Sequence, residues 1–84
     1  MSDTFYCPGH RRLVADSARE AAQVFAGREA RREFGKRAYV RVLRLDSWTE
    51  NGHSHTFEAF IGRDVAPNEC SGRNVWIHVD RVEA

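Results

Sequence analysis

Hydrophobic and polar residues alternate along three segments in the C-terminal half of the chain. The segments are Ala38–Leu45, His55–Ile61 and Val75–Val82, and each is rich in β-branched and aromatic residues. A period of two is typical of a strand that buries one face. The sequence therefore predicts three consecutive strands after residue 37.

A different pattern precedes these strands, because Ala, Arg, Glu and Gln dominate the run from Ala18 to Phe34. All four are good helix formers. Ser17 can accept a hydrogen bond from the first free amides, and Glu20 stands three residues later, as in a capping box. Gly35 can adopt the left-handed conformation that ends a helix. One helix over Ala18–Phe34 is expected.

The faces of this helix are less regular than its ends. A small-residue stripe is formed by Ala18, Ala21, Ala22 and Phe25. Continued at 3.6 residues per turn, the stripe reaches Arg28, Glu29 and Arg32, whereas Ala30 and Phe34 fall on the opposite side. Either the helix bends near Gly27 or its last turns project past the sheet. We prefer the second interpretation, which exposes Arg28, Arg31 and Arg32.

Asn51-Gly52 lies between the first two strands and is a strong hairpin signal. A tight turn there would place Leu43 opposite Phe60, Leu45 opposite Glu58 and Val42 opposite Ile61. The side predicted to form the core then carries Val40, Val42, Phe57, Ala59, Ile61, Val75, Ile77 and Val79. The opposite side carries Tyr39, Arg41, Leu43, Glu58, Phe60, Trp76, His78 and Asp80. With one helix in the chain, that side is either exposed, covered by Phe5 and Tyr6, or the seam of a homodimer.

These elements predict one α+β domain over residues 1–84, with a helix packed on a three- to four-stranded antiparallel sheet in the order β-α-β-β-β. The first strand is expected within Arg11–Ala15. Residues 62–73 contain two glycines, Pro67 and Asn68, and are expected to form a long loop.

Composition and charge refine this picture. The 84 residues are 42% hydrophobic and 30% charged, with a mean hydropathy of −0.59. This balance and the lack of a long apolar run or signal peptide predict a cytoplasmic protein with no membrane partner. The net charge of +1 is divided unevenly: residues 10–45 carry +6, residues 46–84 carry −4, and Asp3 carries the remaining −1. A divided charge of this kind can accompany a surface that faces a polyanion.

The chain offers few groups for catalysis or metal binding. Cys7 and Cys70 are its two cysteines, and we expect both to be reduced. Cys7, His10, His53 and His55 include ligand types for zinc, but no second CxxC or HxxxH completes a site. No residue can be assigned as a base for Cys70. We therefore predict no enzyme activity, no cofactor and no bound metal, with a zinc-stabilised module as a minor alternative.

The remaining features predict a binding protein, because a mixed aromatic and charged face beside basic residues suits a partner with complementary charge. The predicted partner-binding residues are Arg28, Arg31, Arg32, Lys36, Arg37, Tyr39, Arg41, Phe60, Trp76 and His78. The alternative is direct nucleic-acid binding, in which the basic residues contact phosphates and the aromatic residues stack on bases. Glu58 and Asp80 on the same face argue against that alternative.

The chain also resembles a known group of small proteins. A Ser-capped helix that begins Asp16-Ser17-Ala18-Arg19-Glu20-Ala21-Ala22 is followed by strands at Tyr39–Arg44, His55–Phe60 and Val75–Asp80. In size and element order this is similar to phage-encoded type I anti-CRISPR proteins with one helix on an antiparallel sheet. The likeness spans about Leu13 to Val82, and no functional residue is carried over by position. The resemblance implies an inhibitor in a bacterial host cell that docks on a CRISPR surveillance complex, a protein complex that handles nucleic acid, and blocks DNA access or nuclease recruitment.

Overall fold

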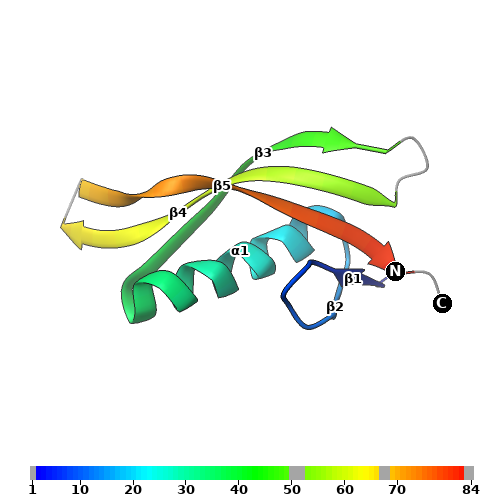
Figure 1. Cartoon of the computed structure of the whole chain (residues 1–84), viewed down its shortest axis with the longest axis horizontal. Helices are drawn as coiled ribbons and strands as arrows, with labels where there is room; N and C mark the ends of the chain where they lie inside the picture. The colour runs from blue at the N-terminus through cyan, green and yellow to red at the C-terminus, as the bar shows by residue number, and fades with distance from the viewer. Residues whose placement is uncertain (1, 50–52, 67–68, 83–84) are drawn as a thin grey trace.

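The computed structural model describes residues 2–49, 53–66 and 69–82, and within them one helix packs on a single antiparallel sheet (Figure 1). The elements in chain order are β1 (Asp3–Tyr6), β2 (Leu13–Ala15), α1 (Ala18–Phe34), the 3₁₀ turn η1 (Gly35–Arg37), β3 (Ala38–Trp48), β4 (Ser54–Ala66) and β5 (Glu69–Val82). The predicted α+β class is confirmed. No helix in the described part of the chain is long and apolar enough to cross a membrane.

The sheet has five strands in the order β2-β1-β5-β4-β3, one strand more than the upper end of the prediction. The additional strand is β1, which pairs with β5 through Thr4, Phe5 and Tyr6 and with β2 on its other side. Phe5 therefore belongs to the sheet and lies in the core, so the N-terminal segment does not cover the outer side. The element order is β-β-α-β-β-β.

Helix α1 begins and ends where the sequence predicts. The Ser17 hydroxyl accepts a hydrogen bond from the Glu20 amide at 3.1 Å, and the Glu20 carboxylate accepts one from the Asp16 amide at 3.0 Å. Gly35 has a φ of 71°, and its amide donates to the Arg31 carbonyl.

The expectation that the last turns of α1 project past the sheet is wrong. Ala30 is 1% exposed, and Phe34 packs against the core. The buried row advances every four residues, through Ala22, Ala26, Ala30 and Phe34, and so it drifts around the helix instead of following a straight stripe. Figure 1 gives the reason: the strands twist and cross over α1, so the sheet follows the drifting face.

The predicted register of β3 and β4 is wrong by two residues over most of its length. Trp48 pairs with His55, as a tight turn at 51–52 requires, but Val42 pairs with Ala59 instead of Ile61. Two register shifts, between Val42 and Arg44 and between Leu45 and Ser47, account for the difference. One shift of one residue would turn the paired side chains to the opposite face of the sheet, and the second shift turns them back. The predicted core residues therefore do lie on the helix side.

The long loop expected over residues 62–73 is also wrong, because these residues extend β4 and β5. Gly62 pairs directly with Gly72. A Cβ added at Gly72 would clash with the Ile61 carbonyl oxygen, so the two backbones lie too close together for a side chain at this position. The glycines that indicated a loop are instead the condition for this close pairing. Pro67 and Asn68 lie outside the described residues.

Candidate binding surfaces

The outer face, defined here as the side of the sheet opposite α1, displays large side chains over β3, β4 and β5. Tyr39 and Leu43 are each 39% exposed and Trp76 is 58% exposed. Strand pairing places Phe60 beside Arg41, and the Tyr39 and Phe60 rings meet edge to face with centroids 6.2 Å apart. The predicted outer positions therefore form one surface, and none of the described elements lies over it.

Most charges on the outer face are already paired. Arg44 Nε lies 3.2 Å from Glu58 Oε1, and His78 Nε2 lies 3.0 Å from Asp80 Oδ1. The Thr56 hydroxyl lies 2.9 Å from the other ring nitrogen of His78. The Glu58 and Asp80 carboxylates therefore both have partners within this face, which leaves its exposed aromatic and aliphatic side chains free to contact another molecule.

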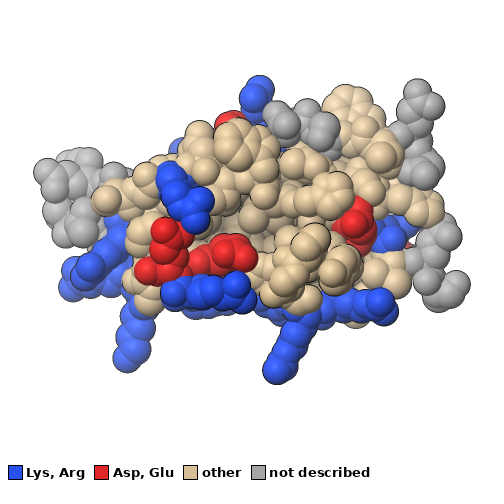
Figure 2. All heavy atoms as spheres, in the orientation of Figure 1, with Lys and Arg blue, Asp and Glu red and all other residues tan. Residues whose placement is uncertain are grey.

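Most basic residues of the prediction lie elsewhere, on α1 and on the turn η1 that follows it. Arg31, Arg32, Lys36 and Arg37 are exposed. Figure 2 shows the Lys and Arg side chains gathered along the helix side of the molecule, whereas uncharged atoms dominate the sheet side. The ten predicted partner-binding residues therefore divide between two surfaces, with Arg41 on the outer face and Lys36 and Arg37 at the turn that joins the two.

Arg28 differs from the other basic residues, because it has a structural role. Its guanidinium donates to the Arg11 carbonyl at 3.0 Å and lies 5.7 Å from the centre of the Phe25 ring. It holds the loop between β1 and β2 against the helix, so it is a poor choice for a test of binding alone.

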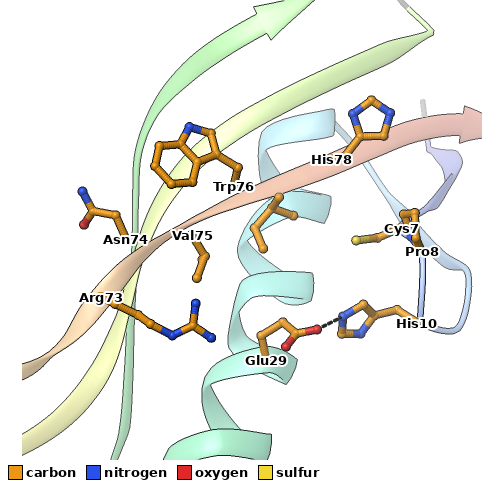
Figure 3. Close-up of a pocket in the computed structure, with 10 residues that line it drawn as sticks. Cys7, Pro8, His10, Glu29, Arg73, Asn74, Val75, Trp76 and His78 are labelled. Carbon is orange, nitrogen blue, oxygen red and sulfur yellow. Dashed lines mark hydrogen bonds and ion pairs between the residues drawn. The ribbon is translucent and has the colours of Figure 1, made fainter.

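A third feature is a groove of about 540 Å³ between the β1–β2 loop, α1 and β5 (Figure 3). Its lining comprises Cys7, Pro8, His10, Glu29 and residues 73–78. His10 Nε2 lies 2.6 Å from Glu29 Oε1, and the His10 side chain is only 2% exposed. Arg73 crosses from β5 to Glu33 on α1 at 2.9 Å. No sequence motif marks this groove, because three segments that are distant in the chain form it.

Cys7 is poorly placed in this groove to act as a nucleophile. Burial, with a smaller effect of Glu29 and Asp80, raises the pKa of the Cys7 thiol to about 11, which opposes formation of the nucleophilic thiolate. No hydrogen bond joins the Cys7 sulfur to the His10 ring, which is already held by Glu29. The side chain of Cys70 lies outside the described residues.

The zinc alternative finds no support in the positions of its ligands. Within residues 2–49, 53–66 and 69–82, as far as their side chains are described, no three His, Cys, Asp or Glu residues lie close enough to hold a metal ion. Cys7 and His10 line the groove, whereas His55 lies in β4 beside Trp48 and Val79. Among the described side chains, the structure therefore does not bring Cys7 and His10 together with His55.

Comparison with known proteins adds no further constraint: no protein-family model, curated protein or solved structure matches the chain.

Proposed function

We propose that the protein is a non-catalytic binding protein and that the outer face of its sheet is the interface. The observation that carries this proposal is the uncovered group of Tyr39, Leu43 and Trp76 on the outer face. Exposed aromatic residues grouped on one face are typical of protein interfaces, in which they supply most of the binding energy.

The partner is a protein surface. Glu58 and Asp80 stand among the aromatic residues of the outer face, so this face is not the continuous basic surface that contact with a phosphate backbone requires. A face that mixes aromatic side chains with paired charges suits a protein partner of complementary charge. The resemblance to type I anti-CRISPR proteins supplies the first partner to test, a CRISPR surveillance complex whose DNA access or nuclease recruitment the protein would block.

The test is affinity capture from a bacterial lysate that contains such a complex, with nuclease present. The variant Tyr39→Ser/Trp76→Ser removes the apolar centre of the outer face. The matched control is Val24→Ser, since Val24 on α1 is also partly exposed, at 38%, but lies away from the sheet. We expect the outer-face variant to lose the captured complex and the control to retain it. Equal capture by both variants would exclude the outer face.

Direct nucleic-acid binding is a second candidate, favoured by the exposed basic residues of α1 and η1. Arg31, Lys36 and Arg37 have no acidic partner within ion-pair distance in the described part of the chain, and Arg32 lies 3.8 Å from Glu29. The variant Arg31→Glu/Lys36→Glu tests this candidate by binding to labelled single-stranded and duplex oligonucleotides. A phosphate-led mode requires affinity that falls steeply with salt and is lost in the variant. Affinity that is insensitive to both would exclude it.

A further inference from the structure

Strand β5 has one edge that is only partly used. Its other edge pairs with β4 from residue 69 to residue 80. On the free side, β1 covers only Asp80, Arg81 and Val82. Residues 73–79 therefore form an open strand edge, and the groove described above lies directly beside it.

The direction of the free backbone groups follows from one hydrogen bond. The Arg81 amide donates to the His53 carbonyl at 2.7 Å, so position 81 points its backbone groups toward β4. Backbone direction alternates along a strand, and so Asn74, Trp76 and His78 direct theirs toward the open edge. No other described group hydrogen bonds to the backbone of these three residues.

The sequence explains why β1 stops where it does. Tyr6 pairs with Asp80, so Pro8 would be the residue opposite His78 if the strand continued in the same register. Proline has no amide hydrogen to give to that ladder, and Gly9 turns the chain away with a φ of 84°. Strand β1 therefore ends because of Pro8 and Gly9, and the edge of β5 beyond it is left without a neighbouring strand.

The groove beside the edge specifies what can occupy it. Its charged groups are satisfied within the protein, because Glu29 pairs with His10 and Arg73 with Glu33. Apolar surface is supplied by Val75 below the β5 ribbon and by Trp76 above it, as Figure 3 shows. An extended polypeptide has amides and carbonyls at the same spacing as the free backbone groups of β5, so it can form hydrogen bonds with them. Its side chains would contact Val75 on one side of the strand and Trp76 on the other.

We propose that a partner protein inserts an extended segment along this edge as a sixth strand, antiparallel to β5 and in line with β1. This proposal rests on the proposed function, and it states the form in which the protein partner binds. The segment forms backbone hydrogen bonds with Asn74, Trp76 and His78, carries an apolar residue toward the groove, and lies next to the outer face through Trp76.

A second copy of the chain fits this edge less well. In a two-fold pairing centred on Trp76, residues 80–82 of one copy would lie opposite residues 70–72 of the other. Strand β1 occupies this edge of β5 at residues 80–82, so it would collide with the neighbouring β5. A short segment of a partner protein that ends before it reaches β1 avoids that collision.

The test uses a phage-displayed library of random peptides selected against the intact protein. The variant Asn74→Pro/His78→Pro removes two amide donors that point to the open edge and leaves the ladder with β4 intact. The matched control, Asn74→Ala/His78→Ala, removes the same side chains but keeps both donors. We expect selected peptides to bind the alanine control as they bind the wild type, and to bind the proline variant about tenfold more weakly.

A second measurement covers the case in which the proline variant fails to fold. Hydrogen exchange of the wild-type protein should show that selected peptides slow the exchange of the Asn74, Trp76 and His78 amides. Three results would overturn the proposal. The first is that no peptide is selected, and the second is that selected peptides slow amide exchange in another part of the protein. The third is that the wild-type protein forms a dimer that the proline substitutions dissociate. If the lysate partner is lost with Tyr39→Ser/Trp76→Ser but retained by the folded proline variant, strand addition fails and the proposed function stands.

Discussion

The two faces of the sheet follow the same alternation, but only one of them is covered. On the inner face, Ile61 and Val79 are fully buried under α1. On the outer face, Trp76 is 58% exposed, although it lies in the same strand as Val79. Burial under the helix accounts for the apolar residues of the inner face. The apolar residues of the outer face have no such cover in the described part of the chain, and the proposed partner would supply it.

The largest effect is expected from Phe25→Ala, which removes the largest buried side chain that α1 places against the sheet. Truncation of a buried phenylalanine costs about 3–5 kcal/mol. In a domain of 84 residues this is a large part of the free energy of unfolding. Urea denaturation followed by circular dichroism should show it, whereas Trp76→Ala on the outer face should cost less than about 1 kcal/mol. Equal costs would contradict the difference between the faces.

The next effect concerns the close pairing of β4 and β5. Gly72→Ala places a Cβ against the Ile61 carbonyl and should cost about 1–3 kcal/mol, as overpacking does. Gly27→Ala is the matched control, because the added Cβ meets only the end of the Arg31 side chain, at 4.0 Å, in the middle of a helix. That control should raise the unfolding free energy by about 0.5–1 kcal/mol. Loss of stability in both variants would argue against a specific close approach at Gly72.

A smaller effect is expected at the beginning of the covering helix. Ser17→Ala removes the hydroxyl that accepts from the Glu20 amide and should cost about 1 kcal/mol. Ser17→Asp keeps an acceptor at the same position and should restore most of that loss. Thermal unfolding of the two variants checks the prediction, and equal loss in both would show that the cap does not act through this hydrogen bond.

The smallest effect is the pH dependence of the buried Cys7 thiol. Its pKa is raised from 9.0 to about 11, so the folded state disfavours the thiolate relative to the unfolded chain. The contribution to stability is complete below pH 9 and is lost as the pH rises toward 11. In a Cys70→Ser background, Cys7 should react with iodoacetamide more slowly than free cysteine at pH 8, and denaturant should abolish the difference. Rapid labelling of the folded protein would place the thiol outside the core.

The sequence predicted those features that depend on local pattern. The ends of α1 follow from Ser17, Glu20 and Gly35, and the two faces of the sheet follow from alternation alone. The strand register was wrong and the faces were right, because two register shifts in β3 each move the pairing by one residue. Neither shift is marked by a glycine, so no local pattern indicates them.

Other features depend on the assembled molecule and had no local signal. The drift of the buried row toward Phe34 results from the twist of the sheet. Gly62 and Gly72 look like loop residues until they are seen to face each other. The groove joins His10 to Glu29 and Arg73, which come from three separate segments. The open edge of β5 depends on the register that places Pro8 opposite His78.

The most direct test of the central claim is hydroxyl-radical footprinting of the protein, free and bound to its captured partner. Tyr39 and Trp76 should lose labelling on binding, because the outer face is the proposed interface. Trp48 is the internal control, since it is 66% exposed but pairs with His55 on the inner side, and it should label equally in both states. Protection of Trp48 with unchanged labelling of Tyr39 and Trp76 would contradict the account.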